Sequence, residues 1–136
     1  MDTHNITAIH KQGNSFTSHI NGHQLVTDSN SEGLSEGPSP KRLMLASLAG
    51  CTGIDVVSIL TKMRVSFSDF SIDINASLTE TEPQLYKEVM ITYKIKIAAV
   101  DHPKMQKAVK LSEEKYCGVS AMFRAFARVD HKIVYL

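Results

Sequence analysis

The sequence predicts an α+β protein with the element order β-β-β-α-β-β-α-β, and three observations support this class. Two short turn signals, Gly13-Asn14 and Asn21-Gly22, divide the N-terminal segment, and Asn-Gly is the strongest two-residue signal for a β-hairpin. A long apolar segment then follows a Ser-Pro pair, which is typical of a helix. Two later segments alternate apolar and polar residues with the period of two that is typical of strands.

The N-terminal third of the chain is predicted to form three strands, near residues 5–11, 15–20 and 23–28. Residues 29–40 are rich in Ser, Gly and Pro and should form a loop. The strands before this loop are too short to hold a core of their own. We therefore predict a single domain over residues 1–136.

A long helix is predicted to begin after Ser39, with Pro40 at its first position, and to run to about Met63. Its apolar residues point in nearly every direction, which is typical of a helix that is buried all round. At 1.5 Å per residue it would be roughly 35 Å long, too long for one small core to cover. We therefore expect a second subunit to cover it. Gly50 and Gly53 would each cost about 1 kcal/mol relative to alanine in a helix, so another element should approach them closely.

The second half of the chain is predicted to contain two alternating strands, a helix and a final strand. The first strand, 70–78, should bury one face, formed by Ile72, Ile74, Ala76 and Leu78. The second strand, 89–97, should bury Val89, Ile91, Tyr93, Ile95 and Ile97. A helix should start at residues 101–103 and carry, at helical spacing, Met105, Val109, Ser112 and Tyr116. The final strand is expected within residues 124–136.

The composition excludes several classes of protein. With 43% hydrophobic and 21% charged residues the chain resembles an ordinary globular protein. Its net charge of +1 gives no basic footprint for nucleic acid. The longest charge-free run in the apolar region, 43–54, is well short of the ~20 residues that span a bilayer. No basic segment followed by an apolar run marks the N-terminus, so we expect a cytoplasmic protein without a membrane partner.

The positions of the histidines and cysteines bear on whether the chain holds a metal ion or a reactive thiol. His19 and His23 are four residues apart, but the Asn-Gly turn between them rules out a shared helical face. Cys51 and Cys117 form no CxxC pair, and two cysteines alone cannot build a structural zinc site. We therefore predict no metal and no cofactor. The residues alone leave two interpretations of the cysteines open: two inert core thiols, or a transient redox pair.

Two motifs carry a resemblance to a known family. The segment "GPSPKRLMLASLAGCTGIDVVSIL", followed much later by "LSEEKYCGVSAM", resembles the superfamily of osmotically inducible protein C and organic hydroperoxide resistance protein (OsmC/Ohr). The similarity extends over nearly the whole chain and is greatest to the YhfA-like branch. It implies an OsmC-like fold in which two subunits intertwine, with two sheets around long central helices and two active sites at the subunit interface.

The resemblance also implies an activity. Family members with known activity are thiol-dependent peroxidases that reduce organic hydroperoxides. Cys51 would be the peroxidatic cysteine and form a sulfenic acid, and Cys117 would resolve it as a disulfide that an external dithiol reduces. The cysteines should then be near neighbours even when reduced. The alternative is a non-catalytic dimeric binding protein that holds an apolar ligand in an interfacial pocket.

One family feature is missing from this chain. The efficient peroxidases hold the thiolate with an arginine from the N-terminal sheet, but no arginine precedes Arg42 here. Possible substitutes are Lys41, Arg42, His19 and His23. With a cation from another segment or the other subunit, the pKa of Cys51 should lie below the ~8.5 of a free thiol.

Overall fold

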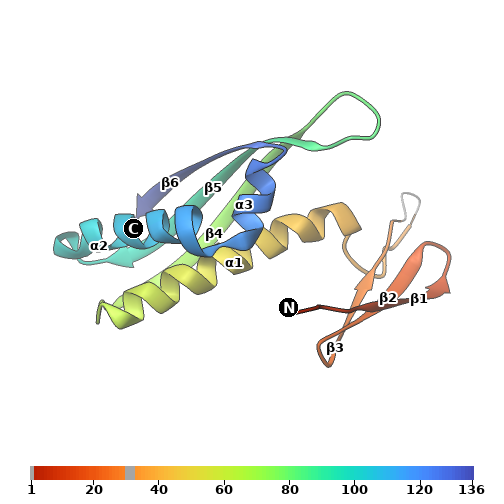
Figure 1. Cartoon of the computed structure of the whole chain (residues 1–136), viewed down its shortest axis with the longest axis horizontal. Helices are drawn as coiled ribbons and strands as arrows, with labels where there is room; N and C mark the ends of the chain where they lie inside the picture. The colour runs from red at the N-terminus through yellow and green to blue at the C-terminus, as the bar shows by residue number, and fades with distance from the viewer. Residues whose placement is uncertain (1, 30–32) are drawn as a thin grey trace. The chain divides into compact units, whose positions relative to one another are not determined.

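The chain forms two three-stranded sheets and an α-helical layer, as a computed structural model describes for residues 2–29 and 33–136 (Figure 1). The α+β class and the order of the elements are confirmed. Contacts divide the chain into two compact units, residues 1–45 and 46–136, which are described separately below. The prediction of one domain over residues 1–136 stays a prediction.

The N-terminal unit contains an antiparallel sheet of β1 (Thr7–Gln12), β2 (Ser15–Ile20) and β3 (His23–Thr27), in that order. Both predicted turns are confirmed. Gly13, Asn21 and Gly22 have positive φ angles of 53°, 49° and 81°, the backbone region that tight hairpins require and that Gly and Asn adopt most readily.

The loop after β3 is tied back to the hairpins through two carboxylates, although residues 30–32 of the predicted loop lie outside the described residues. Asp28 accepts hydrogen bonds from the backbone N–H groups of Ser29 and Glu36, at 2.7 and 3.0 Å. Glu36 in turn accepts one from the Ser15 hydroxyl at 2.7 Å. Gly37 must be glycine because a Cβ atom there would collide with the carbonyl oxygen of Val26.

Helix α1 (Pro40–Lys62) begins one residue after Ser39, as predicted, and ends one residue before the predicted end. The Leu43 N–H donates to the Ser39 carbonyl at 3.3 Å. Gly53 confirms the expected close approach, since a Cβ atom there would lie 3.1 Å from Cδ1 of Ile72. At Gly50 the expectation is wrong within one chain, because no atom of the described residues would come within 4 Å of a Cβ atom.

One face of α1 is buried within a single chain, and the expectation that a second subunit covers the rest of the helix stays a prediction. The buried residues follow each other at intervals of four: Leu48, Thr52, Val56 and Leu60. On other faces Ile54 and Val57 are 72% and 40% exposed, and Met44, one turn before Leu48, is 43% exposed. By length and composition alone α1 could also cross a membrane. The short length of the charge-free run 43–54 is therefore not a sufficient argument against a membrane span. The core helix of a soluble protein passes the same test.

In the C-terminal unit, β5 (Tyr86–Ile97) is the central strand of the sheet. It pairs antiparallel with β4 (Phe67–Leu78) and parallel with β6 (Arg128–Tyr135). Helices α2 (His102–Leu111) and α3 (Gly118–Arg124) lie with α1 along the sheet (Figure 1). Four of the five predicted inward residues of β5 are buried, whereas Ile97 is only half-buried. With residues of the helices they form the core, which contains Val89, Ile91, Tyr93, Ile95, Leu48, Val56, Leu60, Met105, Val109 and Phe123.

Two details of this unit differ from the prediction, and the place of the last strand is confirmed. Leu78 is 40% exposed; it is the last residue of β4 and pairs with Tyr86, beyond a register shift in which Lys87 of β5 is left unpaired. Tyr116 is 54% exposed because the predicted second helix changes after α2 into a π-helical turn, Ser112–Tyr116, which rotates later residues away from the buried stripe. The last strand, β6, lies within the predicted range 124–136, after α3 ends at Arg124.

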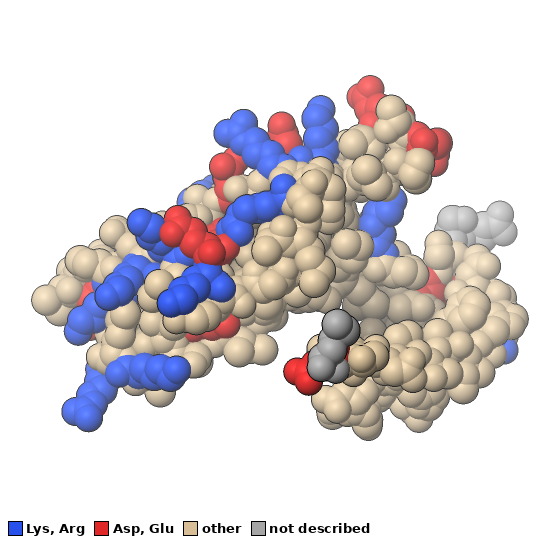
Figure 2. Space-filling model, viewed as in Figure 1, with Lys and Arg blue, Asp and Glu red and all other residues tan. Residues whose placement is uncertain are grey.

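The charged residues are unevenly distributed. On the face drawn in Figure 2, Lys and Arg side chains over the C-terminal unit are interspersed with Asp and Glu. The N-terminal sheet carries fewer charges and exposes large apolar side chains, among them Ile9, Phe16 and Leu25, at 55%, 40% and 37%. The strand register places Phe16 and Leu25 on one face of this sheet and Ile9 on the other, so each face exposes apolar side chains.

Candidate active site

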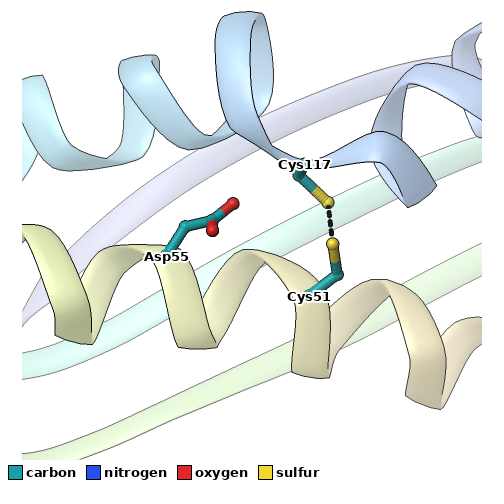
Figure 3. Close-up of side chains that lie close together, drawn as sticks. All are labelled: Cys51, Asp55 and Cys117. Atoms are coloured by element: carbon teal, nitrogen blue, oxygen red, sulfur yellow. Dashed lines mark hydrogen bonds between the residues drawn. The ribbon is translucent and has the colours of Figure 1, made fainter. Parts of the chain in front are cut away.

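The structure brings the two cysteines into direct contact (Figure 3). The Cys117 thiol donates a hydrogen bond to Cys51 Sγ, with 2.7 Å between the sulfur atoms. Both cysteines are free thiols; Cys51 is partly exposed, and Cys117 is buried, with 3% of its surface accessible. The two residues are therefore near neighbours in the reduced state, as the resemblance implied. Their catalytic roles stay predictions.

Local backbone geometry explains how Cys117 reaches α1. The π-helical turn ends at Cys117, whose φ and ψ of −82° and 102° leave the helix for an extended conformation. Its N–H donates to the Ser112 carbonyl at 2.7 Å, and its sulfur accepts the Ser120 N–H at 3.2 Å, so that Cys117 is the N-cap of α3. A π-helical turn is rare and occurs frequently at functional sites. The break therefore places this thiol on the side facing Cys51.

The surroundings of Cys51 favour the protonated thiol. Burial raises its pKa most, followed by the hydrogen bond with Cys117, and the charge of Asp55 raises the pKa further. The backbone N–H of Val119 acts in the opposite direction. None of these groups is a cation; the lowered pKa of Cys51, which was predicted to depend on a cation from another segment or the other subunit, stays a prediction. The proposed substitutes Lys41, Arg42, His19 and His23 belong to the N-terminal unit, and their role stays a prediction.

Asp55 is the site residue that the sequence analysis missed. It lies one helical turn after Cys51 on α1, and its carboxylate accepts a hydrogen bond from the Ser112 hydroxyl at 2.9 Å. One ligand atom each of Cys51, Asp55 and Cys117 lies within 4.8 Å of the others (Figure 3). The spacing of four residues puts Asp55 and Cys51 on the same helical face, and this signal could have identified it.

A buried carboxylate, Glu113, lies close to Cys117 in the sequence and pairs with two exposed side chains. Glu113 is 5% exposed, and its carboxylate lies 2.8 Å from His131 Nδ1 and 3.8 Å from Arg124 Nη2. Arg124 and Ser120 also donate hydrogen bonds to the Glu113 backbone carbonyl. The hydrogen bond between the Glu113 carboxylate and the His131 ring is the main cause that raises the pKa of His131. The network joins the π-helical turn to α3 and β6, and so fixes the segment that carries Cys117.

A groove of about 490 Å³ shares Asp55 with the cysteine cluster. Its wall is mainly apolar, with one lysine, and is formed by Asp55, Ser58, Ile59, Lys62, Met63, Leu111 and Tyr116. Asp55 lies one helical turn after Cys51 on α1, and Tyr116 directly precedes Cys117 in the sequence. The groove therefore lies beside the cysteine cluster and meets it at Asp55.

The comparisons with known proteins agree with this architecture. The family model described as OsmC-like protein matches residues 32–132. Protein YhfA of Escherichia coli strain K12 is 33% identical over 110 residues, which are 81% of this chain and 81% of YhfA. The chain belongs to the OsmC-like family. The resemblance to this family and to YhfA is thereby confirmed.

Solved structures of other proteins have the same fold. A hypothetical protein from Aquifex aeolicus VF5 aligns with a TM-score of 0.84 at 26% identity, covering 100% of this chain and 99% of that protein. An organic hydroperoxide resistance protein from Elizabethkingia anophelis aligns with a TM-score of 0.75 at 11% identity, covering 100% and 98%. The second likeness shows the fold alone.

Proposed function

We propose that this OsmC-like protein is a thiol-dependent peroxidase that reduces organic hydroperoxides in the cytoplasm. The observation that carries the proposal is the contact between a partly exposed thiol and a buried one, 2.7 Å apart. Membership of the OsmC-like family supports it, as do the names of several proteins of the same fold, which are called organic hydroperoxide resistance proteins. Relatives called YhfA carry no activity in their name.

The proposed cycle has three steps. The Cys51 thiolate attacks the outer peroxide oxygen, the O–O bond breaks, and the alkoxide leaves as an alcohol after taking a proton, so that Cys51 becomes a sulfenic acid. The Cys117 sulfur then attacks the Cys51 sulfur and releases water, which leaves a disulfide. An external dithiol reduces the disulfide and is itself oxidised. Cys51 is the more exposed sulfur, which suits it to the first step.

Peroxide consumption with a panel of dithiol reductants tests this function. We expect the protein to consume an organic hydroperoxide catalytically with at least one dithiol, at one dithiol oxidised per peroxide. If no dithiol supports consumption and both thiols survive excess peroxide, the proposal is wrong. That result would favour the alternative, a non-catalytic dimeric protein that binds an apolar ligand in an interfacial pocket.

The raised pKa of Cys51 leads to a prediction about pH. Because the thiolate is the nucleophile, the rate constant for the first step should rise about tenfold per pH unit as long as the pH is below the pKa. We expect this slope from pH 6 to 8 when the loss of the Cys51 thiol is followed by stopped flow. A rate constant that is level over this range would mean that Cys51 is already a thiolate and that a cation absent from the described surroundings holds it.

We also propose that the protein is a homodimer. The apolar side chains that α1 exposes, Ile54 and Val57, and those of the N-terminal sheet support a partner subunit. An obligate interface should bury more than ~2,000 Å² in total. Light scattering at micromolar concentration should therefore give twice the chain mass of 15.0 kDa. A folded species with the mass of one chain would contradict the proposal.

A further inference from the structure

Two thiols and one carboxylate converge at the candidate site, and this combination of donors has a second chemistry. The sulfurs of Cys51 and Cys117 and a carboxylate oxygen of Asp55 all lie within 4.8 Å of one another. They come from two segments of the chain, α1 and the turn before α3 (Figure 3). Two soft sulfur ligands and one carboxylate are suited to a thiophilic divalent ion such as Zn²⁺.

We propose that the reduced protein binds a thiophilic divalent metal ion through Cys51 Sγ, Cys117 Sγ and the Asp55 carboxylate. Binding releases the two thiol protons to solvent and involves no electron transfer. Three protein ligands leave the fourth tetrahedral position open for water, the arrangement of catalytic rather than structural zinc sites. The sequence prediction of no metal considered the cysteines without Asp55, which supplies the third ligand.

The ligands are held in place by outer hydrogen bonds. Asp55 accepts the Ser112 hydroxyl at 2.9 Å, and Cys117 Sγ accepts the Ser120 N–H at 3.2 Å. Outer hydrogen bonds of this kind orient metal ligands and tune their affinity. Tetrahedral binding at about 2.3 Å from each sulfur would separate the two sulfurs to roughly 3.7 Å. The Cys51 side chain is partly exposed, so it can turn outward by this amount.

The position of Asp55 is the strongest argument for a metal. A carboxylate beside two thiols repels their thiolates, because like charges a few ångströms apart in a partly buried site interact strongly. In a site used only for thiol chemistry, this residue opposes the formation of the nucleophile. A divalent cation reverses the effect, since all three negative groups then face the same positive charge. The groove that Asp55 lines gives an ion and its waters access.

Metal binding and disulfide formation exclude each other, because a disulfide has no thiolate to offer. The inference therefore goes beyond the proposed peroxidase cycle and does not require it. It requires only that both thiols be reduced. A bound ion would also withhold both sulfurs from peroxide until it dissociates.

Cobalt titration of the reduced protein under nitrogen tests the inference. We expect one Co²⁺ per chain, with a near-ultraviolet band from thiolate-to-cobalt charge transfer and visible bands typical of tetrahedral Co²⁺. Zn²⁺ should displace the cobalt, because it binds such sites more tightly. The oxidised protein and the variants Cys51→Ser and Cys117→Ser should lack the two-sulfur band.

The decisive variant is Asp55→Asn, which keeps the size and hydrogen-bonding capacity of the side chain. Loss of an outer-shell partner alone weakens metal binding by about 10- to 100-fold, so loss of this ligand should cost at least ~tenfold. The matched control is Asp73→Asn, which removes an exposed carboxylate on β4 that pairs with Lys94 at 2.7 Å. It should bind cobalt like the unchanged protein.

Two results would overturn the inference: no charge-transfer band in the reduced protein, or equal cobalt affinity in Asp55→Asn and Asp73→Asn. Circular dichroism of each variant shows whether it is folded. X-ray absorption gives a second test of the metal site that does not depend on the measured affinity. X-ray absorption of the zinc-loaded protein should find two sulfur and two oxygen or nitrogen neighbours per ion. A protein that binds cobalt but ignores peroxide would contradict only the proposed function, and one that reduces peroxide without binding cobalt would contradict only the metal site.

Discussion

Replacing Cys51 with serine is expected to abolish peroxide consumption while the fold persists. Serine is nearly the same size, and the Cys51 side chain is partly exposed, so the packing around α1 changes little. A serine hydroxyl does not form an anion near neutral pH and cannot carry the peroxide oxygen. We expect a loss of at least ~100-fold in the rate of consumption, or about 2.7 kcal/mol in activation free energy at 1.36 kcal/mol per factor of ten.

The matched control for this variant is Thr61→Ser, which lies on the same helix ten residues later and is exposed. Its consumption rate should equal that of the unchanged protein. The assay is loss of an organic hydroperoxide with a dithiol present, and circular dichroism checks the fold. Full activity in Cys51→Ser would show that Cys51 is not the nucleophile.

The oxidised protein is expected to be more stable than the reduced protein. A bond between Cys51 and Cys117 closes a loop across a sequence separation of 66 residues. The chain-entropy model gives about 4 kcal/mol for a loop of this size, less any strain in the folded state. The bond needs little rearrangement, because the two sulfurs already lie in contact.

Urea denaturation of both forms, followed by circular dichroism, measures this difference. The midpoint should rise clearly on oxidation, and Cys117→Ser treated with the same oxidant should show no such rise. An oxidised form that is equal or lower in stability would mean that the disulfide distorts the helices that carry the two cysteines.

Local signals in the sequence predicted the fold well. Asn21-Gly22 and Ser39-Pro40 act through backbone geometry within a few residues, so the hairpin and the start of α1 were placed correctly. Tyr116 was misplaced because a single π-helical turn shifts every residue after it relative to a regular helix. No signal in the chain marks such a turn.

The candidate site could be predicted in part. The nearness of Cys51 and Cys117 came from family resemblance, because residues 66 positions apart cannot be paired from periodicity. Asp55 was within reach of sequence reasoning, since it shares a helical face with Cys51. The buried pairing of Glu113 with Arg124 and His131 was not, because it joins three elements that only the folded chain brings together.

The burial of α1 could not be judged from one chain's sequence. The pattern predicted apolar contacts on every face, whereas a single chain buries only the stripe that contains Leu48, Val56 and Leu60. Ile54, at 72% exposure, belongs to the remaining apolar surface. A partner subunit would cover the apolar residues of α1 that the single chain leaves exposed.

Intact mass after one equivalent of an organic hydroperoxide tests the central claim most directly. In reduced, metal-free protein we expect the loss of two hydrogens per chain with no added oxygen, and peptide mapping should find Cys51 linked to Cys117. A stable added oxygen on Cys51 would mean that Cys117 does not resolve the sulfenic acid. An unchanged mass, with both thiols still titratable, would contradict the peroxidase account.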